Sequence, residues 1–202
     1  MEPRRLDPWA TVEVDISVHW ALITVFASPL IVLPAAEGQQ LYPEPQIAEI
    51  STMRLVGFSL EMSRVNDKTS ELWRTFLNRR DEVMNRSTQD SVSMQIYPNG
   101  PEQIADPAAS FTKWAVVEVD SFENVPEGMD TYTLRSGTYA VFEHNGPATD
   151  QSTVMHIYTE WLPNSDKYEL DNREHFEVLP PGYNALDPNA HEQFWIPIKL
   201  RD

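Results

Sequence analysis

The sequence predicts an α+β fold made of two similar halves, each with the order strand, helix, strand, strand. In the second half, a strand pattern over residues 138–143 precedes a helical pattern, and strand patterns over residues 175–179 and 193–199 follow. The first half shows the same order over residues 53–119. Elements in this order are typical of an antiparallel sheet that carries its helices on one side. We therefore expect a tandem duplication of a strand-helix-strand-strand unit.

The first half begins with an expected strand over residues 53–62. Gly57 inside it indicates a bulge or a close backbone approach. Asn66-Asp67 offers an N-cap for the following helix. That helix carries one apolar stripe, made of Leu72, Trp73, Phe76 and Leu77. Strand patterns over residues 91–97 and 111–119 complete this half.

In the second half, Asp150 or Ser152 can cap the expected helix. Its apolar residues share one face at helical spacing: Val154, Ile157, Tyr158, Trp161 and Leu162. Pro163 predicts the end of the helix, because its ring cannot continue the backbone hydrogen bonding.

Glu177 is a carboxylate inside the otherwise apolar strand pattern of residues 175–179. Burying a charge there costs several kcal/mol unless another group pairs with it. Glu177 is therefore a candidate to meet a cationic or hydrogen-bonding ligand. The pattern is equally compatible with a Glu177 that faces solvent, because one face of an antiparallel strand is commonly wet. Alternation places His175 and Leu179 on the same face as Glu177.

A second carboxylate, Glu118, shares a strand face with Trp114 and Val116. Two carboxylates near aromatic walls suit an organic cation, which is attracted by charge and by the ring faces. They also suit general acid and base chemistry if burial raises one pKa. An edge or solvent-facing position for Glu118 remains open.

Aromatic side chains are more numerous than a small core requires. The candidates are Phe58, Trp73, Tyr97, Trp114, Tyr139, Phe142, Trp161 and Trp195. Most are expected in the core. Tyr97 and Tyr139 are the best candidates for polar contacts in a pocket, because each brings a hydroxyl on an apolar body.

Composition excludes several classes of protein. With 15 basic and 31 acidic residues, the formal net charge of −16 opposes direct binding to a phosphate backbone. The absence of cysteine excludes disulfides and thiol chemistry. His156 and Glu160 have a spacing that could hold a metal, but no accompanying motif supports one, and a surface contact is expected. No phosphate-binding loop or nucleophile elbow is present, so we expect neither a metal nor a cofactor.

Residues 1–43 are expected to form an N-terminal extension that is partly disordered or packs on the domain of residues 44–202. Residues 11–18 alternate like a strand, and residues 21–33 form an apolar run that is too short to span a membrane. An export signal within residues 1–36 is the alternative to a cytoplasmic location, although acidic residues dilute its positive region.

Four segments in this order resemble the GyrI-like small-molecule-binding domain, the effector-binding domain of AraC-type and multidrug-responsive transcription activators. They are Gly137 to Pro147, Trp161-Leu162-Pro163, Phe176-Glu177 and Trp195 to Lys199. The resemblance spans residues 44–199. It implies a tandem duplication around a central, aromatic-walled ligand cavity whose buried glutamate meets lipophilic cations. Some members stand alone without a DNA-binding domain, and some of those are reported as hydrolases of cyclopropane-containing metabolites.

The resemblance implies a stand-alone protein that binds a lipophilic, cationic or aromatic small molecule. The expected ligand-binding residues are Glu177, Glu118, Trp114, Tyr97, Tyr139, Trp161, Trp73 and Phe58. Without a helix-turn-helix segment, such a protein would regulate transcription only through a protein partner.

Two alternatives stay open. In the first, the protein is a hydrolase in which Glu177, with Glu118, activates water against a strained electrophile. Many relatives carry Tyr two residues after the strand glutamate, where this chain has Leu179, and this departure weakens the hydrolase hypothesis. In the second, the protein is a protein–protein interaction module with a filled cavity.

Overall fold

The computed structural model of the protein describes residues 42–201. The alternating segment 11–18 and the apolar run 21–33 of the expected N-terminal extension lie outside the described residues. Within residues 42–201, no helix is long and apolar enough to cross a membrane.

Nine strands form the framework of the described chain. They are β1 (Gln46–Ile50), β2 (Met53–Met62), β3 (Ser91–Ile96), β4 (Phe111–Val119), β5 (Asp130–Leu134), β6 (Gly137–Asn145), β7 (Tyr168–Leu170), β8 (His175–Leu179) and β9 (His191–Leu200). The helical segments are α1 (Thr69–Arg79), η2 (Arg80–Glu82), η3 (Pro101–Ala105), α2 (Ser152–His156), η4 (Ile157–Trp161) and α3 (Leu162–Asn164). The sequence patterns located β2, β3, β4, β6, β8 and β9 to within a few residues, and they missed β1, β5 and β7.

The strands pair antiparallel in the order β1-β6-β9-β8-β3-β4-β2-β5, and β7 pairs with β9. Within this sheet, the order β2-β4-β3 of the first half repeats as β6-β9-β8 in the second. The halves join where β3 pairs with β8. The predicted α+β fold with two equivalent units is confirmed, and its centre is the β3–β8 pair.

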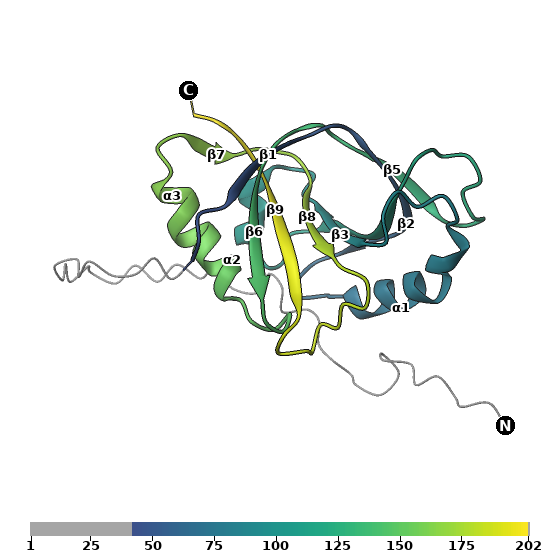
Figure 1. Ribbon diagram of the computed structural model, residues 1–202. Helices are drawn as coiled ribbons and strands as arrows, with labels where there is room; N and C mark the ends of the chain where they lie inside the picture. Colours follow the sequence, from purple (N-terminus) through teal and green to yellow (C-terminus); the bar gives the residue numbers. More distant parts are fainter. Residues whose placement is uncertain (1–41, 202) are drawn as a thin grey trace.

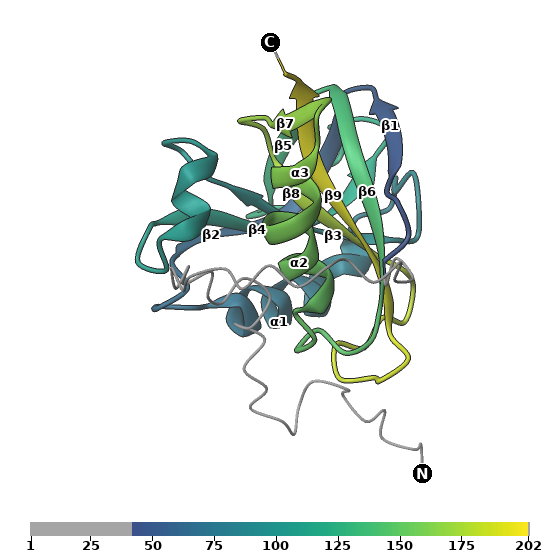
Figure 2. The same ribbon diagram turned by 90° about the vertical axis from the view of Figure 1, so that its left-hand side faces the viewer.

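The edges of the sheet also tie the halves together. β1 precedes the first unit but pairs with β6 of the second, and β5 precedes the second unit but pairs with β2 of the first. Each half therefore completes the sheet of the other. Figures 1 and 2 show the resulting strong twist, with β2 and β4 crossing the direction of β6 and β9.

Helix α1 begins at Thr69 with Lys68 at its N-cap, so the N-cap predicted at Asn66-Asp67 is one residue too early, although Asp67 still contacts the first turn. Asp67 Oδ1 accepts hydrogen bonds from the backbone N–H of Thr69 at 3.1 Å and from its hydroxyl at 2.6 Å. The helix packs on β2 and β4. It does so through the predicted apolar stripe, in which Leu72, Trp73 and Phe76 are buried.

The second helix is continuous through α2, η4 and α3, and η4 is a turn of π-helix. Asp150 Oδ1 accepts the backbone N–H of Ser152 at 2.9 Å at its start. It ends at Asn164, one residue after Pro163, because proline keeps a helical backbone angle and removes only its own N–H donor.

Both helices cover the same face of the sheet. The buried cluster on that face joins Leu72 and Phe76 of α1 to Val154 and Ile157 of the second helix. A separate cluster on the other face consists of strand residues, including Leu55, Trp114, Tyr139 and Phe176. In Figure 1, α1 and the α2–α3 helix lie at opposite ends of the sheet, so its centre lies between them.

Candidate functional site

A cavity of about 310 Å³ lies on the helix-covered face at the junction of the two halves. Its walls come from α1, from β3, β4 and β8, and from the loop after β8. Trp73, Leu77, Phe111 and Leu179 are large apolar lining residues. The ionisable lining residues are Arg64, Asp67, Arg80, Lys113, Glu177, Tyr183 and Glu192.

Glu177 lies on the central strand pair at the floor of this cavity. It stands opposite Ser93 of β3 and opposite Phe194 of β9, and it is only 4% exposed. The solvent-facing alternative for Glu177 is therefore wrong. Burial of its carboxylate requires compensating charge and hydrogen bonds from the protein.

Lys113 supplies the nearest opposite charge. Its Nζ lies 3.9 Å from Glu177 Oε2, and both side chains are 5% exposed. This separation exceeds the length of a direct charged hydrogen bond, about 2.7–2.9 Å, so the two groups attract each other by Coulomb interaction without that bond. The cavity floor therefore holds a buried ion pair rather than a lone carboxylate.

Two tyrosine rings lie around His175 of β8, at 6.1 Å for Tyr97 and 6.4 Å for Tyr158 between ring centres. Tyr97 donates its hydroxyl to Gln95 Oε1 at 3.1 Å, and Tyr158 shares a hydrogen bond of 2.9 Å with His175 Nδ1. Burial, with a further contribution from the Glu177 charge, raises the pKa of Tyr97 and that of Tyr158. These phenols therefore stay protonated at neutral pH and act as hydrogen-bonding groups.

Burial, with a smaller contribution from the nearby Arg173 charge, lowers the pKa of His175 from 6.5 to about 3. Between these two values the unfolded chain binds a proton that the folded protein excludes. The free energy of unfolding should therefore fall as the pH falls from about 6.5 towards 3. Between pH 7.0 and 5.5 we expect a loss of about 1 kcal/mol from this group, measured by urea unfolding.

His175→Gln should remove that part of the pH dependence, whereas His191→Gln should leave it unchanged, because the His191 side chain is 49% exposed. Equal pH dependence in the wild type and His175→Gln would contradict a neutral, buried His175.

Several cavity residues were not predicted from the sequence. Tyr183 comes from the loop after β8, and Glu192 from β9. Burial first, and then the Glu192 and Glu177 carboxylates, raise the pKa of Tyr183. Lys113 could have been found by the argument applied to Glu177, since it is also a charge within an apolar strand pattern. Arg64 lies in a connection that carries no periodic pattern, so no sequence signal pointed to it.

Three predicted site residues gather at the cavity. Glu177 and Trp73 line it. The Tyr97 ring lies 5.3 Å from that of Phe111, a lining residue, and the Tyr97 hydroxyl reaches the lining residue Gln95.

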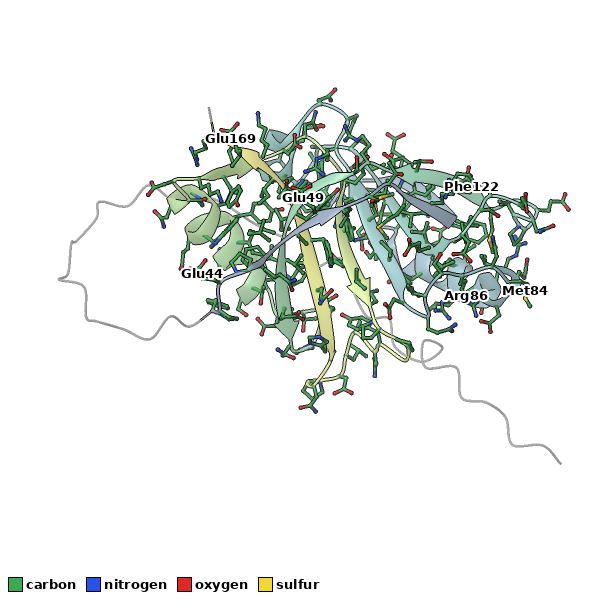
Figure 3. All side chains as sticks on the ribbon, turned by 45° about the horizontal axis from the view of Figure 1, so that its top comes forward. Glu44, Glu49, Met84, Arg86, Phe122 and Glu169 are labelled. Carbon is green, nitrogen blue, oxygen red and sulfur yellow. The ribbon has the colours of Figure 1, made fainter. Side chains whose placement is uncertain are left out.

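Two predicted residues lie on the helix-covered face but away from the cavity. Phe58 packs beneath the Arg79 guanidinium, whose Cζ lies 5.6 Å from the centre of the Phe58 ring. Trp161 packs edge-on against Phe142 at 5.1 Å and donates its Nε1–H to Glu44 Oε2 at 3.2 Å. Figure 3 shows Glu44 beside the α2–α3 helix, at the end opposite Met84 and Arg86, which lie near α1.

The structure does not bring Trp114, Tyr139 or Glu118 together with Glu177. Trp114 and Tyr139 belong to the cluster on the opposite face of the sheet, and strand alternation directs Glu118 to that face as well. Burial raises the pKa of Glu118, with a contribution from Asp120. The expected pair of cavity carboxylates does not form from Glu118 and Glu177.

Among the described residues, no group of three or more His, Asp or Glu side chains could hold a metal ion. His156 instead shares a hydrogen bond of 3.0 Å with Glu160 and stacks on Tyr42.

Comparison with known proteins identifies the family. The model of the Cass2 family, described as an integron-associated effector-binding protein, matches residues 46–198. The chain belongs to the Cass2 family. This family has the GyrI-like fold and is related to the ligand-binding domains of transcription regulators. No curated protein matches the sequence.

Solved structures share the fold of this Cass2-family protein. SAV2435 bound to tetraphenylphosphonium superposes with a TM-score of 0.60 and 16% identity, over 78% of this chain and 94% of that protein. The C-terminal domain of EcmrR gives a TM-score of 0.56 and 13% identity, over 79% and 98%. The integron cassette protein Cass2 from the mobile metagenome of Vibrio cholerae gives 0.50 and 17%, over 78% and 97%.

Proposed function

We propose that this Cass2-family protein is a receptor for a small molecule with an aromatic or other lipophilic body, and that Glu177 is the polar anchor of its cavity. The observation that carries the proposal is a buried carboxylate at the floor of a cavity of about 310 Å³ with apolar walls. Ligand sites are typically clefts of roughly this size or larger, with a few polar groups that fix orientation.

The position of Glu177 supports a receptor rather than a purely structural charge. It lies at the β3–β8 junction, where the two halves meet. Trp73 and Leu77 of α1 form one apolar wall, and Leu179 contributes to the floor. A cationic or hydrogen-bond-donating group of the ligand would meet Glu177, and its lipophilic body would contact these walls. SAV2435, which shares the fold, was solved with a lipophilic cation bound.

Any effect on transcription would pass through a protein partner, because a net charge of −16 opposes contact with a phosphate backbone. We also propose a cytoplasmic location for this receptor, because acidic residues dilute the positive region that an export signal within residues 1–36 would need.

A hydrolase remains the second candidate, and one feature of the cavity favours it. Leu179 gives no hydroxyl at the position where many relatives carry Tyr, but Tyr183 lines the cavity together with Glu177. The Glu177 charge also contributes to the raised pKa of Tyr97 and of Tyr158. A carboxylate with nearby phenols could activate and position a water molecule. Incubating each bound compound with the protein and analysing it by mass spectrometry distinguishes turnover from binding.

Glu177→Gln should abolish ligand-induced stabilisation. We expect saturating lipophilic cations or aromatic dyes to raise the melting temperature of the wild type by about 5 °C or more, and that of the variant by much less. Differential scanning fluorimetry against a panel of such compounds measures this. Glu143→Gln, which removes the same charge from an exposed position, is the matched control.

Equal shifts in the wild type and Glu177→Gln would show that binding does not use the carboxylate. A panel without any shift in the wild type would favour the interaction module with a filled cavity.

A further inference from the structure

Arg64 presents an unused hydrogen-bonding edge within the wall of the same cavity. Its Nη1 donates to the carbonyl of Ile104 at 2.6 Å, which fixes the guanidinium in place. Nε and Nη2 are buried and have no hydrogen-bond partner among the residues that the structure describes. These two nitrogens form the side-on fork of arginine, whose parallel N–H bonds fit the two oxygens of a carboxylate.

The protein does not neutralise this guanidinium with a carboxylate of its own. Within residues 42–201, Arg64 forms no salt bridge. Asp67, a carboxylate that also lines the cavity, uses Oδ1 to accept two hydrogen bonds from Thr69 at the start of α1. A buried N–H group without a partner destabilises the protein, and more so when it is charged, so an acceptor supplied by a ligand would recover that loss.

The remaining charges of the cavity make an acidic ligand group acceptable. Its ionisable lining includes Arg64, Arg80 and Lys113 as cations, and Asp67, Glu177 and Glu192 as carboxylates. Lys113 lies 3.9 Å from Glu177 and offsets its charge. A ligand that is only cationic would gain from Glu177 but would be repelled by Lys113 and would leave the Arg64 fork unfilled.

We propose that the ligand carries a carboxylate, or an anionic group of similar shape, which Arg64 binds side-on through its Nε–H and Nη2–H. This inference rests on the proposed function and adds a second anchor to it. The ligand is then an aromatic acid, and any cationic or donor group that meets Glu177 makes it zwitterionic. Trp73 and Phe111, which line the same cavity, provide apolar contact for the body between the two polar ends.

Three probes with one ring system and different charge test the proposal: 2-naphthoate, its neutral amide 2-naphthamide, and the cation 2-naphthylmethylammonium. Isothermal titration calorimetry of the full chain at about 150 mM salt gives their dissociation constants. We expect the wild type to bind the acid about tenfold or more tightly than the amide, as a charged bidentate contact predicts.

Variants separate the fork from charge alone. Arg64→Gln should bring the acid and the amide to equal affinity. Arg64→Lys keeps the charge but loses the planar fork, and it should retain only a small part of the preference. Arg74→Gln removes one positive charge from an exposed position of α1 and should leave the preference unchanged. Circular dichroism and melting temperature confirm that each variant is folded.

The outcomes distinguish this inference from the function on which it rests. Equal affinity of the wild type for acid and amide, or a preference that survives in Arg64→Gln, overturns anion recognition by Arg64. Failure of all three probes to bind overturns it as well, because a naphthalene ring is small enough for the cavity. If lipophilic cations still stabilise the wild type but not Glu177→Gln in that case, the receptor function stands and only the acid specificity is lost.

Discussion

Replacement of Lys113 by Met should lower the free energy of unfolding by about 3–5 kcal/mol. In the wild type, both side chains of the Lys113–Glu177 pair are 5% exposed. The variant would leave the Glu177 carboxylate buried without its nearest positive charge. Methionine has nearly the length of lysine and fills most of its volume, so the loss reports on charge rather than on a cavity. Urea unfolding at pH 7, with the m-value checked for constancy, measures the effect.

The double variant Lys113→Met with Glu177→Gln should recover much of that loss, because no uncompensated charge is left in the floor. An exposed pair provides the matched control. Lys199 Nζ lies 2.9 Å from Glu169 Oε1, closer than in the buried pair, but the side chains are 53% and 37% exposed. Lys199→Met should therefore cost 1 kcal/mol or less. If Lys113→Met lowers the free energy of unfolding by no more than Lys199→Met does, the buried Glu177 carboxylate does not depend on Lys113.

The framework strands were predictable because local patterning fixes them. The predicted strand over residues 111–119 coincides with β4, and that over residues 53–62 coincides with β2. In such strands alternate side chains enter one of two cores, which leaves a regular pattern in the sequence. β1, β5 and β7 are short and pair only at or near the sheet margins, and the partners of β1 and β5 lie in the opposite half. Nothing local in their sequences identifies such partners.

The site was predicted only in part. Alternation along a strand shows which side chains share a face, but it does not show which face borders the cavity. It correctly placed Trp114 and Glu118 on one face of β4. Which of the two faces of β4 borders the cavity follows from its pairing with β3, where Gln95 stands opposite Lys113, and from the position of α1. The Trp114 ring favoured the face of β4 that does not border the cavity. Lys113, a charge within an apolar strand, indicates the correct face more strongly, because a buried charge needs a partner.

Gly57→Ala should be among the most destabilising single-methyl additions in the chain, with a loss of about 3 kcal/mol or more in the free energy of unfolding. Gly57 lies in β2 between β4 and β5, where its partners are Val116 and Asp130. A Cβ atom built on Gly57 would lie 2.2 Å from the carbonyl oxygen of Ala115 and 2.9 Å from Val116 Cα. Both are backbone atoms of a central strand, so no side-chain rotation relieves the overlap. Urea unfolding of the variant measures the loss.

Gly128→Ala separates this collision from ordinary backbone strain. Gly128 has a φ of +78°, and the nearest atom to an added Cβ is Arg79 Nη1 at 3.8 Å. That variant should lose only the cost of a left-handed backbone, about 1–2 kcal/mol. Gly57 does not have a positive φ, so its requirement for glycine comes from the approach of β4 alone. A folded Gly57→Ala protein would have to shift β4 to relieve the overlap. Because β4 also carries Lys113 of the cavity, the variant should respond less to cavity ligands as well as being less stable. A Gly57→Ala variant as stable as the wild type would show that β2 and β4 do not approach this closely.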